Sequence, residues 1–263
     1  MSQKTLRFLG SLIPWIIPVL VVTAWQLLGS LGILSSQILP TPAKVIEGTL
    51  RIAADGSLYE YIWISTKRAF IGFFIGGSIG FLLGLLNGLF PIASRFLDTS
   101  VQMIRTIPHL ALVPLVILWF GVEEEAKLFL VALGVAFPIY LNTYHGIRNV
   151  DKGLIEMGRV YRLKGFSLFR QILLPGALPS ILVGVRYALG VMWMSLIVAE
   201  TIASDTGIGY MATSAREFMQ MDIVVLSILL YALLGKLSDV IASILERSWL
   251  QWHPNFYRKK KKA

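Results

Sequence analysis

The chain has 263 residues, of which 56% are hydrophobic and 15% are charged, and its mean hydropathy is +0.70. A soluble domain of this composition would expose large apolar patches, so the sequence predicts an integral membrane protein. The formal net charge of +9 gathers in loops and the tail and does not indicate a nucleic-acid partner, while the lack of cysteine excludes disulfides, thiolate catalysis and thiolate metal sites.

Long apolar runs without strand alternation predict an all-α membrane fold, because helices satisfy their own backbone hydrogen bonds in hydrocarbon. A span takes about 20 helical residues. Six stretches qualify, and five spans is the alternative count. The predicted spans are Leu12 to Leu31, Arg68 to Phe90, Ser100 to Phe120, Ala126 to His145, Ile181 to Glu200, and Ile223 to Leu245. Pro108, Pro114 and Pro138 interrupt two of them, which neighbouring helices tolerate in a bundle.

The distribution of Lys and Arg predicts that both termini lie in the cytoplasm. Basic residues gather at the N-terminus, in the second and fourth loops and in the tail, whereas the third and fifth loops are acidic. The first external loop is an exception, because its basic residues outnumber its acidic ones. The first span is expected to be retained rather than cleaved as a signal peptide, since its apolar run is long and lacks a small-x-small site. The run Lys259 to Lys262 is expected to contact anionic lipid headgroups.

The second span carries a glycine every four residues from Gly72 to Gly88. Such a face lacks side chains and lets another helix backbone approach closely. Tight packing inside the bundle is the simpler interpretation, and a surface on which helices rock during transport is the functional one.

Signs of catalysis or metal binding are absent from the sequence. The three histidines, His109, His145 and His253, have no metal-ligand spacing, and no phosphate-binding loop or Gly-x-Ser-x-Gly motif occurs. The sequence therefore predicts a chain that is not an enzyme, without a metal or cofactor of its own. An intramembrane hydrolase using His109 and Glu200 is the formal alternative.

The loop from Ile147 to Leu178 carries six Lys and Arg residues against Asp151 and Glu156. Phe166, Phe169, Leu173 and Leu174 recur near helical spacing and give a short helix an apolar stripe beside its basic face. A helix of this kind is expected to fit a groove on a partner.

This loop resembles the cytoplasmic signature of permease subunits of bacterial ATP-binding-cassette (ABC) importers, Glu-Ala-Ala followed by Gly and then by Ile-x-Leu-Pro. The matching residues are Glu156, Ile172, Leu174 and Pro175, while Gly158 replaces the second Ala and Arg162 replaces the Gly. In that family the segment is the coupling helix that docks on the ATPase subunit. A non-Gly residue forced to positive φ would be strained. Either Gly165 provides the turn instead, or the coupling geometry changes.

The resemblance covers most of the chain. The runs Leu97 to Gly121, Phe137 to Arg148 and Val198 to Tyr210 are similar to the aliphatic sulfonate permeases of the nitrate, sulfonate and taurine group. This resemblance implies one transmembrane permease domain over residues 1–263, of the type I importer (MetI-like) fold, with a cytoplasmic coupling loop at about residues 147–180. It implies location in the bacterial cytoplasmic membrane.

The resemblance also implies partners: a second permease copy, two ATP-binding subunits that hold ATP and Mg²⁺, and an extracytoplasmic substrate-binding protein. Aliphatic sulfonates are the expected substrates. Taurine, nitrate or another small anion is the alternative within this class. An ATP-independent carrier is the alternative outside it, although such a protein needs no docking helix.

A sulfonate path needs hydrogen-bond donors or positive charge beside apolar walls. Polar residues in or near the spans are therefore candidates. They are Gln102, Arg105, His109, Asn142, Thr143, His145, Arg186, Trp193, Glu200, Thr201 and Ser204.

Several candidates have structural interpretations. Arg105 and Arg186 lie near span ends, where snorkelling to the interface is the alternative. His109 follows Pro108 and suits helix packing, while Asn142 and Thr143 suit hydrogen bonds between helices. Glu200 is a candidate for the external gate because it precedes Gly207 and Gly209. Lys236 and Asp239, which share one helix face, are expected to pair or to reach an interface.

Overall fold

The computed structural model describes residues 3–252, with side chains from residue 16 onward except those of residues 109 and 110. Within this range every regular element is a helix, and the elements are α1 (Gln3–Ser30), α2 (Pro42–Ala54), α3 (Ser57–Leu89), α4 (Pro91–Arg105), α5 (His109–Phe120), α6 (Glu124–Arg148), α7 (Lys152–Val160), α8 (Gly165–Leu168), the π-helical turn η1 (Phe169–Leu173), α9 (Leu174–Ala203), α10 (Ile208–Glu217) and α11 (Met221–Trp249). The all-α prediction is confirmed. His253 and the Lys259 to Lys262 run lie outside the described residues.

Four helical stretches in the described part of the chain are long and apolar enough to cross a membrane. They are α3, α6, the continuous run from α8 through α9, and α11. These stretches confirm the second, fourth, fifth and sixth predicted spans, although α3 begins at Ser57 and not at Arg68. Helix α1 covers the predicted first span and contains a shorter apolar stretch, Ile16–Ser30.

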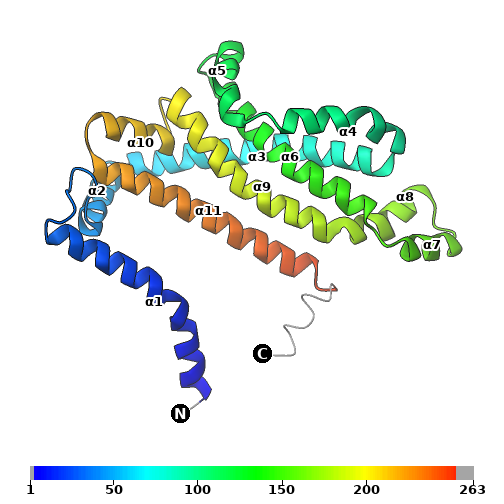
Figure 1. The fold of residues 1–263 in the computed structure, drawn as a ribbon, viewed down its shortest axis with the longest axis horizontal. Helices are drawn as coiled ribbons and strands as arrows, with labels where there is room; N and C mark the ends of the chain where they lie inside the picture. The colour runs from blue at the N-terminus through cyan, green and yellow to red at the C-terminus, as the bar shows by residue number, and fades with distance from the viewer. Residues whose placement is uncertain (1–2, 253–263) are drawn as a thin grey trace.

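The third predicted span differs from the prediction, because it is two helices. Helix α4 ends at Arg105 and α5 begins at His109. Proline disfavours helical geometry in the residue before it, which explains the break before Pro108. Helix α5 has 12 residues, a length of about 18 Å, so alone it is too short to span a bilayer. In Figure 1 it stands at the edge of the bundle, while α4 lies beside α3.

Helices α3 and α6 pack along the predicted glycine face. A Cβ atom added at Gly76 would lie 2.0 Å from the carbonyl oxygen of Ala132, and one at Gly80 would lie 2.2 Å from that of Ala136. No side chain fits between these backbones. The structure therefore confirms the packing interpretation of the repeat.

Helix α9 packs on the other side of α6, again where one helix lacks a side chain. A Cβ at Gly134 would lie 2.4 Å from the Ser195 hydroxyl oxygen, and one at Gly184 would lie 2.6 Å from Asn142 Cβ. Helix α11 runs alongside α9, and α1 splays away from the bundle (Figure 1). The α3, α6 and α9 helices thus form the close-packed centre.

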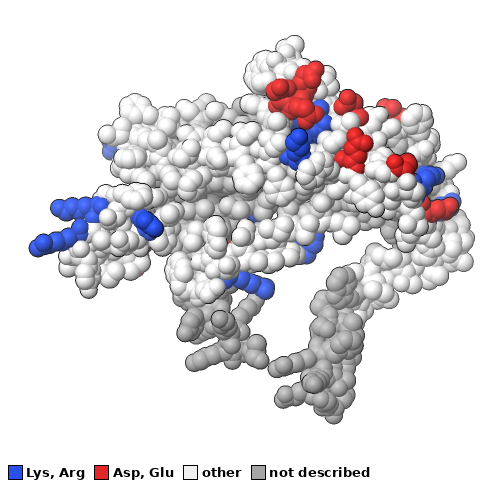
Figure 2. Space-filling view, turned by 180° about the vertical axis from the view of Figure 1, so that it is seen from behind, with Lys and Arg blue, Asp and Glu red and all other residues white. Residues whose placement is uncertain are grey.

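The two ends of the bundle carry different elements. Helices α7 and α8 lie at one end, and α2 and α10 lie at the other (Figure 1). On the face shown in Figure 2, the α7–α8 end carries basic side chains, while acidic side chains gather around the start of α6 and the α2–α10 end. At that second end, Asp55 accepts a hydrogen bond of 3.0 Å from the Ser57 backbone amide, and its hydrogen bonds with Ser57 lower the pKa of the Asp55 carboxyl. The α7–α8 end is thus basic, as the sequence predicts, whereas the α2–α10 end carries both signs of charge, in line with the exception noted for the first external loop.

Candidate functional site

The predicted coupling segment forms helix α7 and a second short helical turn that leads into α9. The Asp151 carboxylate caps α7 by accepting a hydrogen bond of 2.7 Å from the Gly153 amide. Glu156 is exposed, whereas Gly158 is buried. A Cβ at Gly158 would lie 2.3 Å from Ile172 Cδ1, so a residue without a side chain lets α7 pack on η1.

Arg162 itself adopts the left-handed backbone at the end of α7, with φ of 61°. The Leu163 amide donates to the Gly158 carbonyl at 2.9 Å, and the Arg162 amide donates to the Arg159 carbonyl at 2.9 Å. This is the Schellman pattern, whose turn residue is usually Gly. Gly165, with φ of 52°, forms a second turn and does not replace the first.

The far end of the coupling segment is anchored in the bundle. Ile172 packs in an apolar cluster with Ile147, Val150 and Ala177, which joins η1 to the end of α6 and the start of α9. Leu174 packs against this cluster, and Pro175 follows directly after the π-helical turn η1. Because proline has no amide hydrogen, it cannot donate to the preceding turn of this continuous helix, and the wider π-helical turn lies where that bond is missing. Ile172 thus contacts α7 at Gly158 and also the ends of α6 and α9.

An apolar surface faces away from this anchor. Val160, Tyr161 and Phe166 are 81%, 75% and 73% exposed, among exposed basic side chains that include Arg159 and Arg162. Of the predicted apolar stripe only Phe166 is exposed, because Phe169, Leu173 and Leu174 pack inward against the Ile172 cluster. The exposed apolar and basic face is therefore made mostly of other residues than those predicted, although a face of this kind suits docking. Its role in docking stays a prediction.

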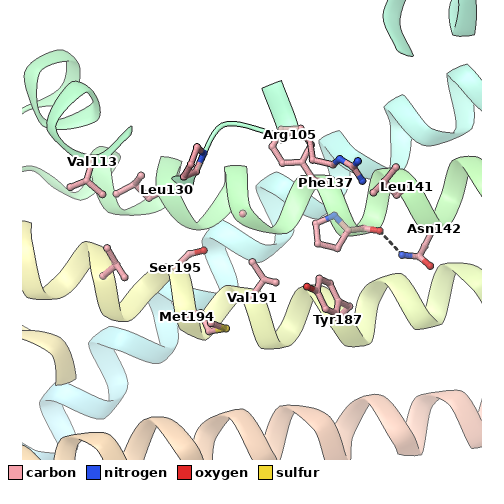
Figure 3. Close-up of a pocket in the computed structure, with 14 residues that line it drawn as sticks. Arg105, Val113, Leu130, Phe137, Leu141, Asn142, Tyr187, Val191, Met194 and Ser195 are labelled. Atoms are coloured by element: carbon pink, nitrogen blue, oxygen red, sulfur yellow. Dashed lines mark hydrogen bonds between the residues drawn. The ribbon is translucent and has the colours of Figure 1, made fainter. Parts of the chain in front are cut away.

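A second candidate site is a cavity of about 600 Å³ between α6 and α9, bordered by the segment that joins α4 and α5 (Figure 3). Its wall is mostly apolar. The polar groups on the wall come from Arg105, Asn142, Tyr187 and Ser195. The Asn142 side-chain amide donates to the Pro138 carbonyl at 2.9 Å, which satisfies the acceptor that a proline frees inside α6. None of the described residues that line the cavity is acidic.

Of the predicted path residues, Arg105 and Asn142 line this cavity. Tyr187 and Ser195 were missed, because an isolated Tyr or Ser in an apolar helix gives no sequence signal that separates a cavity wall from packing. The His109 side chain lies outside the described residues. Gln102 lies on α4, partly buried, and is not among the residues lining the cavity.

The remaining predicted path residues lie elsewhere in the bundle. Thr143 is fully buried and faces Gly84 of α3, while His145 is exposed beside Tyr144. The Trp193 indole donates to the Ser238 hydroxyl at 2.9 Å, joining α9 to α11. Thr201 is exposed near the end of α9. Their roles in transport stay predictions.

Arg186 lies on the α11 side of α9, where it contacts Asp239 at 2.7 Å and Glu246 at 3.3 Å. Asp239 also contacts Lys236 at 3.1 Å, so the predicted pairing of these two residues is confirmed. These contacts neutralise cations that would otherwise face hydrocarbon unpaired.

Glu200 lies at the centre of a buried polar network near the α10 end of the bundle. Its carboxylate accepts hydrogen bonds from the Ser65 hydroxyl at 2.8 Å, Arg68 at 3.0 Å, the Gly209 amide at 2.9 Å and the Tyr231 hydroxyl at 3.0 Å. The donors belong to α3, α10 and α11, so one carboxylate on α9 links four helices.

Arg68 extends the network to α6. Its guanidinium contacts Glu124, which also accepts from Lys127 at 3.1 Å. It donates to the Ser204 hydroxyl at 3.1 Å and the Thr206 carbonyl at 2.7 Å, which fixes the loop between α9 and α10. Sequence analysis placed Glu200 near this loop but did not identify Arg68 as its partner.

The described residues contain no group of three or more His, Cys, Asp or Glu side chains that could hold a metal.

Comparisons with known proteins agree with this geometry. The family model for the inner membrane component of binding-protein-dependent transport systems matches residues 76–251. The chain is 57% identical over 259 residues to the aliphatic sulfonates transport permease protein SsuC of Escherichia coli K12, covering 98% of each chain. It is 42% identical to the Bacillus subtilis 168 protein of the same name, covering 92% of this chain and 87% of that one.

More distant proteins also match, one by sequence and two by structure. The taurine transport system permease protein TauC of Escherichia coli K12 is 32% identical, covering 88% of this chain and 86% of that one. A crystal structure of an amino acid ABC transporter with histidines matches with a TM-score of 0.64 at 16% identity, over 76% of this chain and 97% of that one. The inward-facing MetNI methionine ABC transporter matches with a TM-score of 0.53 at 21% identity, over 72% of this chain and 94% of that one.

Proposed function

Because the chain belongs to the family of inner membrane components of binding-protein-dependent transport systems, we propose that it is the permease subunit of an importer for aliphatic sulfonates. The assignment of aliphatic sulfonates as substrates is supported by the 57% identity, over 98% of the chain, with a protein named for aliphatic sulfonate transport. The apolar cavity with a cationic side chain supports the same substrate class, because an alkanesulfonate joins an anionic head to an apolar tail.

The proposed complex contains two copies of this chain, two ATP-binding subunits and an extracytoplasmic binding protein. ATP and Mg²⁺ belong to the ATP-binding subunits, so this chain acts without a cofactor. Coupling would occur through the segment from Glu156 to Pro175, whose exposed apolar and basic face supports docking on an ATPase. Closure of the ATPase pair would then move α6 and α9 through the Ile172 cluster.

The proposed orientation places both termini and the α7–α8 end in the cytoplasm, and the α2–α10 end outside. The basic loop at the α7–α8 end supports this orientation by the positive-inside rule.

Uptake into proteoliposomes tests the function directly. The complete transporter, with binding protein and ATP supplied on their proper sides, is offered labelled alkanesulfonate, taurine and nitrate in parallel. ATP-dependent uptake that favours alkanesulfonate supports the proposal. Uptake of taurine or nitrate alone keeps the importer and overturns the substrate, whereas ATP-independent uptake favours a carrier. Taurine is the second candidate because of the 32% identity to TauC.

The coupling assignment has its own test. Glu156→Lys reverses a charge on the exposed face of α7, and Glu156→Gln is the matched control that removes charge without reversing it. The Lys variant is expected to stay in the membrane and to lose the ATPase subunit during purification. Retention of the subunit with normal uptake would overturn the assignment.

A further inference from the structure

The cavity between α6 and α9 has the chemistry of a binding site for an organic anion. We propose that it is a substrate subsite inside the permease, in which Arg105 holds the anionic headgroup and the apolar wall holds the alkyl tail. The identity of the anion as a sulfonate rests on the proposed function. The existence of an anion site rests on the cavity itself.

Polar groups gather toward one end of the cavity. Asn142 packs on α9 at Gly184, and Tyr187 lies one helical turn further along α9. In the view of Figure 3, Arg105, Asn142 and Tyr187 lie toward the same end, with the Arg105 guanidinium near Leu141. A guanidinium, an amide and a hydroxyl are hydrogen-bonding groups that suit the three oxygens of a sulfonate.

The other end of the cavity is predominantly apolar. Val113 and Leu130 line this end in Figure 3, with Ser195 at its margin. Ser195 packs against Gly134 and lies eight residues beyond Tyr187, which is about 12 Å along a helix. An alkyl chain that extends from the Arg105 end would therefore bury its apolar surface along this wall.

Arg105 differs from several other cations of the bundle because no carboxylate among the described residues pairs with it. Arg68 and Lys127 contact Glu124, and Arg186 contacts Asp239, so these charges are neutralised inside the protein. Arg105 forms no hydrogen bond or ion pair with the described residues, and no carboxylate is among the residues that line its cavity. An arginine without a counter-ion beside an apolar cavity attracts an anion.

The site also meets the requirement for release. Arg105 is exposed and lies at the last turn of α4, directly before the break at Thr106 to Pro108. Its position therefore depends on α4, whereas most of the apolar wall belongs to α6 and α9, with Val113 of α5 at the far end. Relative movement of these elements would separate the head site from the tail site and so weaken binding, as transport requires.

Uptake by Arg105 variants tests the head site. In the complete transporter, Arg105→Gln is expected to lower the rate of alkanesulfonate uptake at least about tenfold, since a hydrogen-bonded charge is lost. Arg105→Lys is expected to keep part of the rate. Arg95→Gln is the matched control, because Arg95 is an exposed arginine of the same helix and is not among the residues lining the cavity. Equal rates in the two Gln variants would overturn the head site.

Chain-length selectivity tests the tail site. Val191→Phe enlarges a side chain on the apolar wall. The ratio of hexanesulfonate to ethanesulfonate uptake is expected to fall several-fold, a change that general loss of folding would not produce. An unchanged ratio would overturn the tail site.

A cysteine probe tests occupancy without relying on rates. The chain has no cysteine, so a single Ser195→Cys variant reacts at one position. Hexanesulfonate is expected to protect that position from a negatively charged methanethiosulfonate reagent in the intact permease–ATPase complex. Ser36→Cys, at an exposed position between α1 and α2 and not among the residues lining the cavity, is the unprotected control.

The combined outcomes separate the two proposals. Wild-type uptake of alkanesulfonate with no protection at position 195 keeps the proposed function and overturns the subsite. A second outcome also overturns the subsite: decyl sulfate detergent protects position 195 as well as hexanesulfonate does, and the Arg105→Gln and Arg95→Gln variants have equal uptake rates. The cavity would then hold lipid-like molecules. Wild-type uptake of taurine or nitrate alone overturns the proposed function instead.

Discussion

The buried network around Glu200 makes a quantitative prediction. Glu200→Gln keeps the shape of the side chain and replaces one carboxylate oxygen with an NH₂ group. Arg68 donates to one oxygen and the Gly209 amide donates to the other. Both groups are donors only, so each orientation of the Gln leaves one fixed donor facing another donor.

The magnitude follows from burial. Glu200 is 1% exposed, so water does not replace the lost acceptor. Removing one partner of a buried ion pair costs about 3–5 kcal/mol, and the lower end applies because Arg68 keeps its contact with Glu124. A loss of about 3 kcal/mol lowers the ratio of folded to unfolded protein about 100-fold.

Unfolding of the purified permease in mixed micelles, titrated with sodium dodecyl sulfate, measures this loss. Glu125→Gln is the matched control, because Glu125 is exposed on α6 and forms no ion pair with the described residues. The Glu200 variant is expected to unfold at a clearly lower detergent fraction than the control. If both variants unfold together, the network does not stabilise the α10 end of the bundle and the reasoning is wrong.

Three further changes test other parts of the structure by the same unfolding assay or by co-purification. Gly76→Ala is expected to destabilise by roughly 2 kcal/mol or more, because its Cβ would meet a backbone oxygen of α6 at 2.0 Å. Gly190→Ala, with nothing within 4 Å of the added Cβ, is the control and is expected to keep or slightly raise stability. Arg162→Gly is expected to stabilise α7 by about 0.5–1 kcal/mol, because glycine adopts positive φ without strain. Met219, which has φ of 58°, provides the comparison: a similar gain in stability from Met219→Gly would show that the cause is backbone geometry. Phe166→Asp, at a 73% exposed position, is expected to leave the permease stable and to release the ATPase subunit; retention of the subunit would contradict the docking face.

The sequence predicts the helical fold well because hydrophobic length is a direct requirement of the bilayer. The glycine repeat also predicts a close helix contact, and α6 is the partner that the structure supplies. The third span shows the limit of this reasoning. Apolar composition from Ser100 to Phe120 is continuous, but the backbone restriction imposed by Pro108 divides it.

The candidate sites divide in a similar way. The coupling segment can be located from the sequence because the spacing of its residues is a local pattern. The structure adds that Arg162 itself adopts the left-handed turn. The cavity cannot be predicted from the sequence, because its lining depends on which face of α9 packs against α6. Arg105 and Arg186 look alike in the sequence, yet Arg186 is paired with Asp239 and Arg105 borders the cavity. Tertiary partners decide between the two roles.

The coupling segment and the cavity both contact α6 and α9, which suggests how ATP binding on a partner subunit would change the shape of the cavity. Ile172 joins the coupling segment to α6 and α9, whose middle portions form the cavity wall. At the opposite end, Glu200 and Arg68 bind α3, α6, α9 and α10 together. We therefore expect a force on α7 to act on two helices that are held at their far ends and to make them pivot rather than slide. Pivoting changes the cavity width most near Asn142 and least near the Glu200 network. We expect the head end of the cavity, beside Arg105, to open and close during transport.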